Sequence, residues 1–171
     1  MEGLGAVVRG DTATARRTLE ALEGLPRVDQ LRLGAGPHLL RALLAARQDH
    51  WDEVRDLLGP PALRGEHDGS SPAQVASLAT RWLLADAYQR AGRLDSAAAY
   101  LELAVASTRV PFSHLALRGL AYSFAERRLA VIYEKLGQEQ VAQQHWKEFA
   151  GAFTTPDADF ASLMPVETRV R

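Results

Sequence analysis

Four short breaks at similar spacing interrupt an otherwise helix-favouring sequence, and they constrain the fold more than any other feature. They fall at Gly10-Asp11, Gln48-Asp49-His50, Gly92-Arg93 and Gly137-Gln138. Counted from Gly10, Asp49, Gly92 and Gly137, the breaks are 39, 43 and 45 residues apart. Glycine suits such turns because it readily adopts the left-handed conformation that ends a helix. Regular breaks between amphipathic stretches predict repeated helical hairpins with variable connections.

The stretches between the breaks carry helical periodicity. From residue 76 to residue 91, Leu78, Leu84 and Tyr88 recur near one face, and Ala85 occupies a close-contact position. Alternating runs of β-branched residues are absent from the sequence. The chain is therefore predicted to be all-α, without a sheet.

Proline and serine punctuate the longer connections. Gly59-Pro60-Pro61 is expected to end one helix, because proline lacks the N–H that a helix needs. Ser71 is predicted to cap the next helix, and Ser113 to cap a later one. These signals divide a single domain, 1–171, into hairpins at approximately 1–25, 36–59, 72–107 and 113–153, followed by a C-terminal segment, 157–171.

The clearest repeat lies between Arg81 and Ala106 and reads RWLLADAYQRAGRLDSAAAYLELAVA. It resembles a tetratricopeptide repeat, in which a Leu-small pair and a tyrosine precede the turn and small and large residues follow it. The matching positions are Leu84, Ala85, Tyr88, Gly92, Ala97, Leu101 and Ala104. The proline usual after the second helix is replaced by Arg109.

A second stretch, from Glu126 to Ala152, repeats the pattern. Leu129, Ala130, Tyr133, Gly137, Ala142 and Trp146 fall at the same spacings. Phe149 replaces the second small residue, so this hairpin either ends more openly or packs on the C-terminal segment. DHWDEV around Asp49 and GDTATARRTLEAL around Gly10 resemble the family more weakly.

The resemblance implies an α-solenoid of about four stacked antiparallel hairpins, with nine or so helices. Only nine residues precede Gly10, so its first helix is expected to be short, and we expect the chain to be a fragment of a longer protein.

The same resemblance implies a concave groove lined by first helices, in which a protein or peptide partner binds. The implied groove residues are Trp82, Asp86, Gln89, Arg90, Phe124, Arg127, Arg128, Val131, Glu134 and Lys135. Their arginines would grip carboxylates, and Trp82 with Phe124 would hold an apolar anchor. An ordinary solvated helical face is the alternative, and Trp82 alternatively packs on the neighbouring hairpin.

Catalytic and metal-binding patterns are absent from the sequence. It has no cysteine, and its five histidines form no His-x-x-x-His pair. His50 with Glu53, and His145 with Glu148, are three residues apart and are read as surface or interface groups. No enzyme activity, cofactor or metal is therefore expected.

The composition of the chain limits the kinds of partner that it is expected to bind. The net charge of −1 argues against direct nucleic-acid binding, and no apolar run is long enough to span a membrane. The lack of cysteine and of a signal peptide favours the cytoplasm. Arginine greatly outnumbers lysine, which occurs only at Lys135 and Lys147, and this suggests a GC-rich, bacterial genome.

The hairpin series also resembles C-terminal repeat regions of large bacterial signalling proteins, which follow a Ser/Thr kinase or a transcription-activator domain. This resemblance implies a second function, intramolecular regulation by contact with the rest of the same polypeptide. Dimerisation is a further alternative, because a short first hairpin would expose apolar helix surface.

Overall fold

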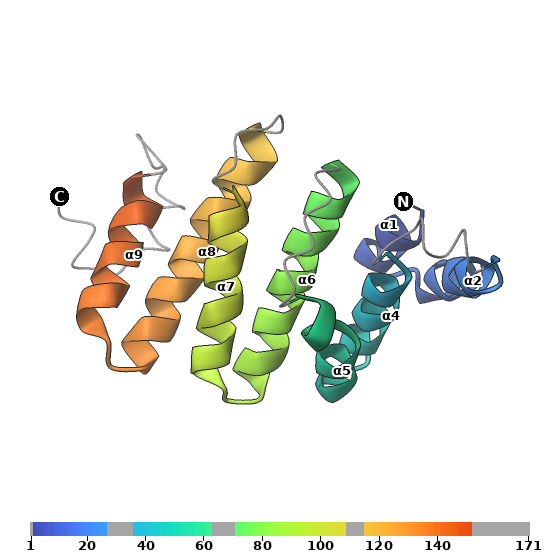
Figure 1. Ribbon diagram of the computed structural model, residues 1–171, viewed down its shortest axis with the longest axis horizontal. Helices are drawn as coiled ribbons and strands as arrows, with labels where there is room; N and C mark the ends of the chain where they lie inside the picture. The colour runs from blue at the N-terminus through green and yellow to red at the C-terminus, as the bar shows by residue number, and fades with distance from the viewer. Residues whose placement is uncertain (1, 27–35, 63–70, 109–114, 152–171) are drawn as a thin grey trace. The chain divides into compact units, whose positions relative to one another are not determined.

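The computed structural model describes residues 2–26, 36–62, 71–108 and 115–151, and these residues are helical apart from short turns (Figure 1). The helices are α1 (Glu2–Val8), α2 (Thr12–Glu23), α4 (Gly36–Arg47), α5 (Trp51–Ala62), α6 (Ser71–Arg90), α7 (Leu94–Thr108), α8 (Leu115–Lys135) and α9 (Glu139–Gly151). No strand occurs in the described ranges, so the predicted all-α class is confirmed for them. The C-terminal segment 157–171 and the cap at Ser113 lie outside them.

All four predicted breaks are tight turns with the same backbone geometry. The turn residues Gly10, Asp49, Gly92 and Gly137 have left-handed φ angles of 80, 58, 71 and 72°. At the last turn, the N–H of Gly137 donates to the carbonyl of Glu134 at 3.0 Å, and the N–H of Gln138 donates to Tyr133 at 2.9 Å. The other three turns repeat both bonds at the corresponding residues, which satisfies carbonyls left over at each helix end.

Small buried residues recur at a constant distance from these turns. Seven residues before the four turn residues stand Gly3, Ala42, Ala85 and Ala130, and five residues after them stand Ala15, Val54, Ala97 and Ala142. All eight are buried. Such positions admit a neighbouring helix closely, so the same packing register follows each turn along the chain.

The chain divides into two compact units, Met1–Arg93 and Leu94–Arg171. In the first unit, α1 contacts α2 and α4, and α4 and α5 both contact α6. The α1 contacts are close, because a methyl group at Gly3 would lie 2.8 Å from Cδ2 of Leu40 and 3.0 Å from Cγ2 of Thr18. Glycine at position 3 therefore lets α1 lie directly on its neighbours.

An arginine also ties α1 to α4. The guanidinium of Arg47, at the end of α4, donates to the carbonyl of Val7 at 2.8 Å and to that of Val8 at 3.4 Å. These are end carbonyls of α1, where a helix carries partial negative charge. Beneath them, Ala6 and Val7 pack with Leu40 and Leu44 in one buried cluster.

In the second unit, α8 contacts both α7 and α9 (Figure 1). Trp146 and Phe149 of α9 pack against Ala130 of α8, with the two aromatic rings edge to face at 5.9 Å. Phe149 has no exposed surface, so the large residue that replaces a small one is accommodated in the core of this helix pair.

One expected helix end is wrong. Gly59-Pro60-Pro61 does not stop α5, which continues through both prolines to Ala62. A proline ring fixes φ near the helical value, so Pro60 and Pro61 continue the helical backbone of α5 although neither has an N–H to donate. The expected start at Ser71 agrees with the first residue of α6.

Candidate functional site

The ten residues predicted to bind a partner lie on two helices that belong to different units. Trp82, Asp86, Gln89 and Arg90 lie on α6 in the first unit, and the other six lie on α8 in the second unit. Within its own unit, each set has a distinct environment.

On α6, Trp82, Asp86 and Gln89 are half-buried, and Arg90 is exposed. The Arg90 guanidinium lies 4.4 Å from the centre of the Trp51 ring, and its Nη1 atom lies 3.8 Å from Oδ1 of Asp49. The indole N–H of Trp51 donates to the same carboxylate at 3.1 Å. Arg90 therefore connects the end of α6 to the α4–α5 turn.

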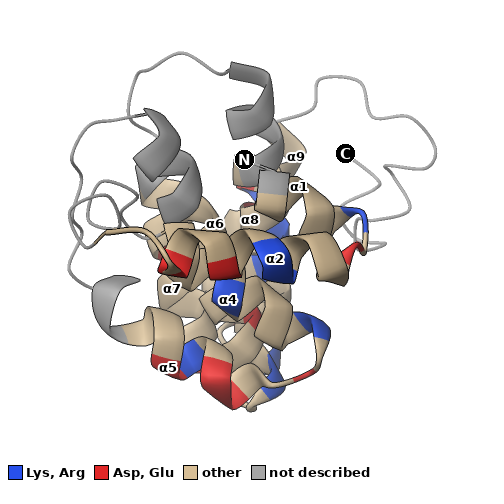
Figure 2. Ribbon diagram, turned by 90° about the vertical axis from the view of Figure 1, so that its right-hand side faces the viewer, with Lys and Arg blue, Asp and Glu red and all other residues tan. Residues whose placement is uncertain are grey.

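A second arginine–aromatic contact lies nearby on α6. The guanidiniums of Arg93 and Arg55 lie 5.0 and 5.9 Å from the Tyr88 ring. Arg55 also forms an ion pair with Asp52 and donates to the carbonyl of Ala87 at 3.4 Å. These contacts hold α5 to the last turn of α6. Both acidic and basic side chains of this region remain exposed to solvent. Figure 2 shows acidic and basic residues interspersed along α2 and α5.

On α8 the six residues form one lengthwise stripe. At about 100° per residue, the spacings of three, four and seven place all six on one side of the helix. We call Phe124, Arg127, Arg128, Val131, Glu134 and Lys135 the α8 stripe. Phe124 is 43% exposed, Glu134 and Lys135 are exposed, and the other three are half-buried.

The stripe is connected to the core of its unit at two points. Val131 packs on the cluster that contains Trp146 and Phe149. The carboxylate of Glu134 accepts a hydrogen bond from the indole N–H of Trp146 at 2.8 Å. The single acidic group of the stripe is thus turned toward α9, whereas Arg127, Arg128 and Lys135 supply its positive charge.

A polar pair in the same unit, a buried carboxylate with a half-buried imidazole, was not predicted from the sequence. The Nδ1 atom of His145 lies 2.6 Å from Oε2 of Glu126, whose side chain is only 1% exposed. Glu148, which stands three residues after His145, accepts hydrogen bonds from Tyr122 and Gln144 instead, each at 3.0 Å. A sequence signal for Glu126 exists, since it stands four residues before the buried Ala130 and so on the same helix face.

Arg81 occupies the corresponding position in the preceding repeat, four residues before Ala85. It is 4% exposed, and burial lowers its pKa. A charged residue four positions before the small core residue is therefore directed inward in both cases.

Tyr133 completes the polar layer around His145. Its ring stacks on the imidazole with centres 5.3 Å apart, and its hydroxyl donates to Glu102 of α7. Burial, followed by the Glu102 hydrogen bond, raises the pKa of Tyr133 well above its usual value. These contacts connect α7, α8 and α9.

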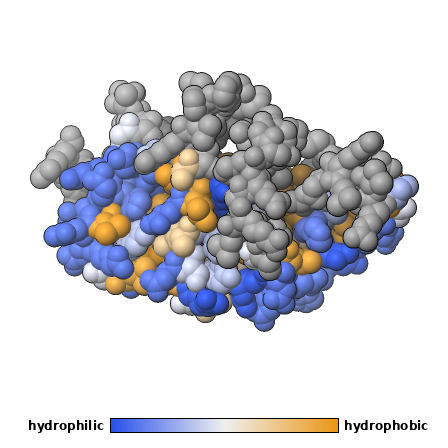
Figure 3. All heavy atoms as spheres, viewed as in Figure 1, coloured by the Kyte–Doolittle hydropathy of each residue, from blue (hydrophilic) through white to orange (hydrophobic). Residues whose placement is uncertain are grey.

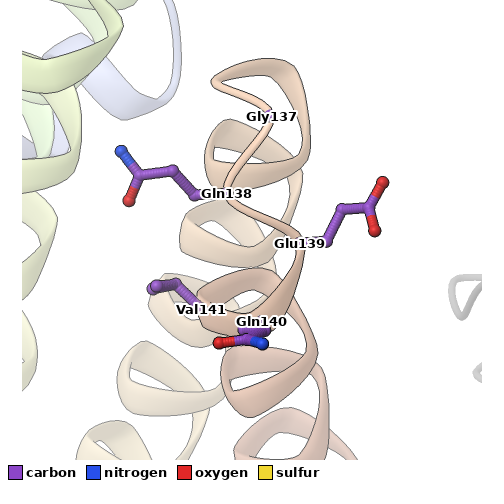
Figure 4. A pocket seen from close by; sticks show the side chains of 5 residues that line it. All are labelled: Gly137, Gln138, Glu139, Gln140 and Val141. Atoms are coloured by element: carbon purple, nitrogen blue, oxygen red, sulfur yellow. The ribbon is translucent and has the colours of Figure 1, made fainter.

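A shallow hollow of about 390 Å³ lies at the α8–α9 turn. Five consecutive residues, 137–141, line it, and Figure 4 shows that the side chains of Gln138 and Glu139 point in opposite directions. The hollow therefore lacks converging polar groups that would fix a small molecule. Among the described residues, no group of three or more His, Asp or Glu side chains is placed to hold a metal ion.

Comparisons with family models, with curated proteins and with solved structures find no match to this chain. None of the helices in the described ranges is long and apolar enough to cross a membrane.

Proposed function

We propose that this chain is a tetratricopeptide-like α-solenoid of about four hairpins and that it binds a protein or peptide partner in the cytoplasm. Support for the repeat comes from the four turns, which share their left-handed residue, their two hydrogen bonds and their register of buried small residues. Recurrent hairpins with one packing register are typical of helical-repeat proteins, whose usual role is to present a binding surface.

The observation that carries the binding proposal is the α8 stripe. Phe124 leaves a large apolar side chain 43% exposed among cationic neighbours. Large aromatic side chains and arginines are enriched at the centres of protein interfaces. Among the described residues of this unit, the other exposed large apolar side chains are Leu103 on α7 and Val141 on α9, and neither is flanked by paired arginines. Figure 3 accordingly shows hydrophobic areas scattered among hydrophilic ones on the visible face.

The chain offers a matched control for a test. Arg127 and Arg128 are adjacent on α8, and Arg16 and Arg17 are adjacent and exposed on α2. Replacing either pair with glutamate changes the net charge equally. A random peptide library would be selected in parallel on the wild-type chain, on R127E/R128E and on R16E/R17E, with helical content checked by circular dichroism.

We expect peptides that bind the wild type and R16E/R17E but not R127E/R128E. Retention of all selected peptides by a folded R127E/R128E variant would remove the stripe as the binding surface. A selection that enriches no sequence on the wild type would count against the binding function itself.

A further inference from the structure

We draw no further inference here: the strongest candidate, the face of α8 that carries the exposed Phe124 beside Val131, has nothing in the structure to show what covers it.

Discussion

Nδ1 of His145 lies 2.6 Å from Oε2 of Glu126, which joins α9 to the middle of α8 through a carboxylate that is almost fully buried. A buried carboxylate is costly unless a partner compensates for its lost hydration. His145 is that partner, and Tyr133 covers the imidazole from one side. The second unit thus contains a specific polar contact beside its apolar core of Ala130, Trp146 and Phe149.

Removing this carboxylate should destabilise the chain. Glu126→Ala leaves the half-buried imidazole without its partner, and we expect a loss of about 1–3 kcal/mol in the free energy of unfolding. Glu139→Ala, at an exposed position on α9, should change it by about 0.5 kcal/mol or less. Urea denaturation of both variants measures the difference. A double-mutant cycle with His145→Ala that shows no coupling would contradict the role assigned to the pair.

Tyr133 should make the folded chain less stable at alkaline pH. Its pKa is raised in the folded chain, by burial and by the hydrogen bond to Glu102, so folding favours the neutral phenol. An unfolded tyrosine ionises near pH 10. The stabilisation is therefore complete below about pH 10 and is lost as the pH rises further. Thermal melts should show that Tyr133→Phe loses less stability than the wild type in this range; equal losses would refute the assignment.

Two glycine substitutions should change the stability of the chain in opposite directions. Gly137 has a φ of 72°, so Gly137→Ala places a Cβ in the left-handed region and should cost about 1–2 kcal/mol. Gly5 lies inside α1 without a positive φ, and a Cβ there would lie 3.2 Å from Nη1, at the far end of the Arg9 side chain. Gly5→Ala should stabilise the chain by about 0.5–1 kcal/mol. Denaturation midpoints distinguish the two, and a stabilising Gly137→Ala would contradict the turn geometry.

Hydrogen bonds from Arg47 should protect the amides of α1 from hydrogen exchange. Arg47→Met removes the donors to the carbonyls of Val7 and Val8, and we expect faster amide hydrogen exchange in α1 together with a loss of about 0.5–1.5 kcal/mol. Arg41→Met serves as the control, because Arg41 lies on the same helix and pairs with Glu23 at the surface. Such a pair contributes about 0–1 kcal/mol. Equal exchange in α1 for both variants would exclude the capping role.

The turns and their register were predictable from sequence, because each depends on a few neighbouring residues. A glycine or aspartate that accepts a left-handed φ, preceded and followed by helix-forming residues, determines where one helix ends and the next begins. Gly92 and Gly137 illustrate this, as do the small residues Ala85 and Ala130 at a constant distance before them. The prolines at 60 and 61 misled the prediction, because a proline φ is compatible with helical backbone and α5 passes through both residues.

The stripe on α8 was likewise visible in the sequence, since helical spacing alone places Phe124, Arg128 and Val131 on one side. Which of its charges faces a neighbouring helix was not visible. Only the packing of α9 on α8 brings Trp146 to Glu134, and His145 to Glu126 rather than to Glu148. The contacts of Arg90 and Arg47 likewise form only because other helices of the same unit pack close to these side chains.

The sequence by itself thus determined the helices, the left-handed turns and the inward-facing small residues, because these follow from local backbone preference and periodicity. The tertiary structure decided the pairings of long polar side chains. Those pairings depend on the distance and angle between helices, and several partners far apart in the sequence satisfy the same local pattern. In this chain the repeated turns are therefore encoded locally, and the Glu126–His145 pair is a consequence of packing.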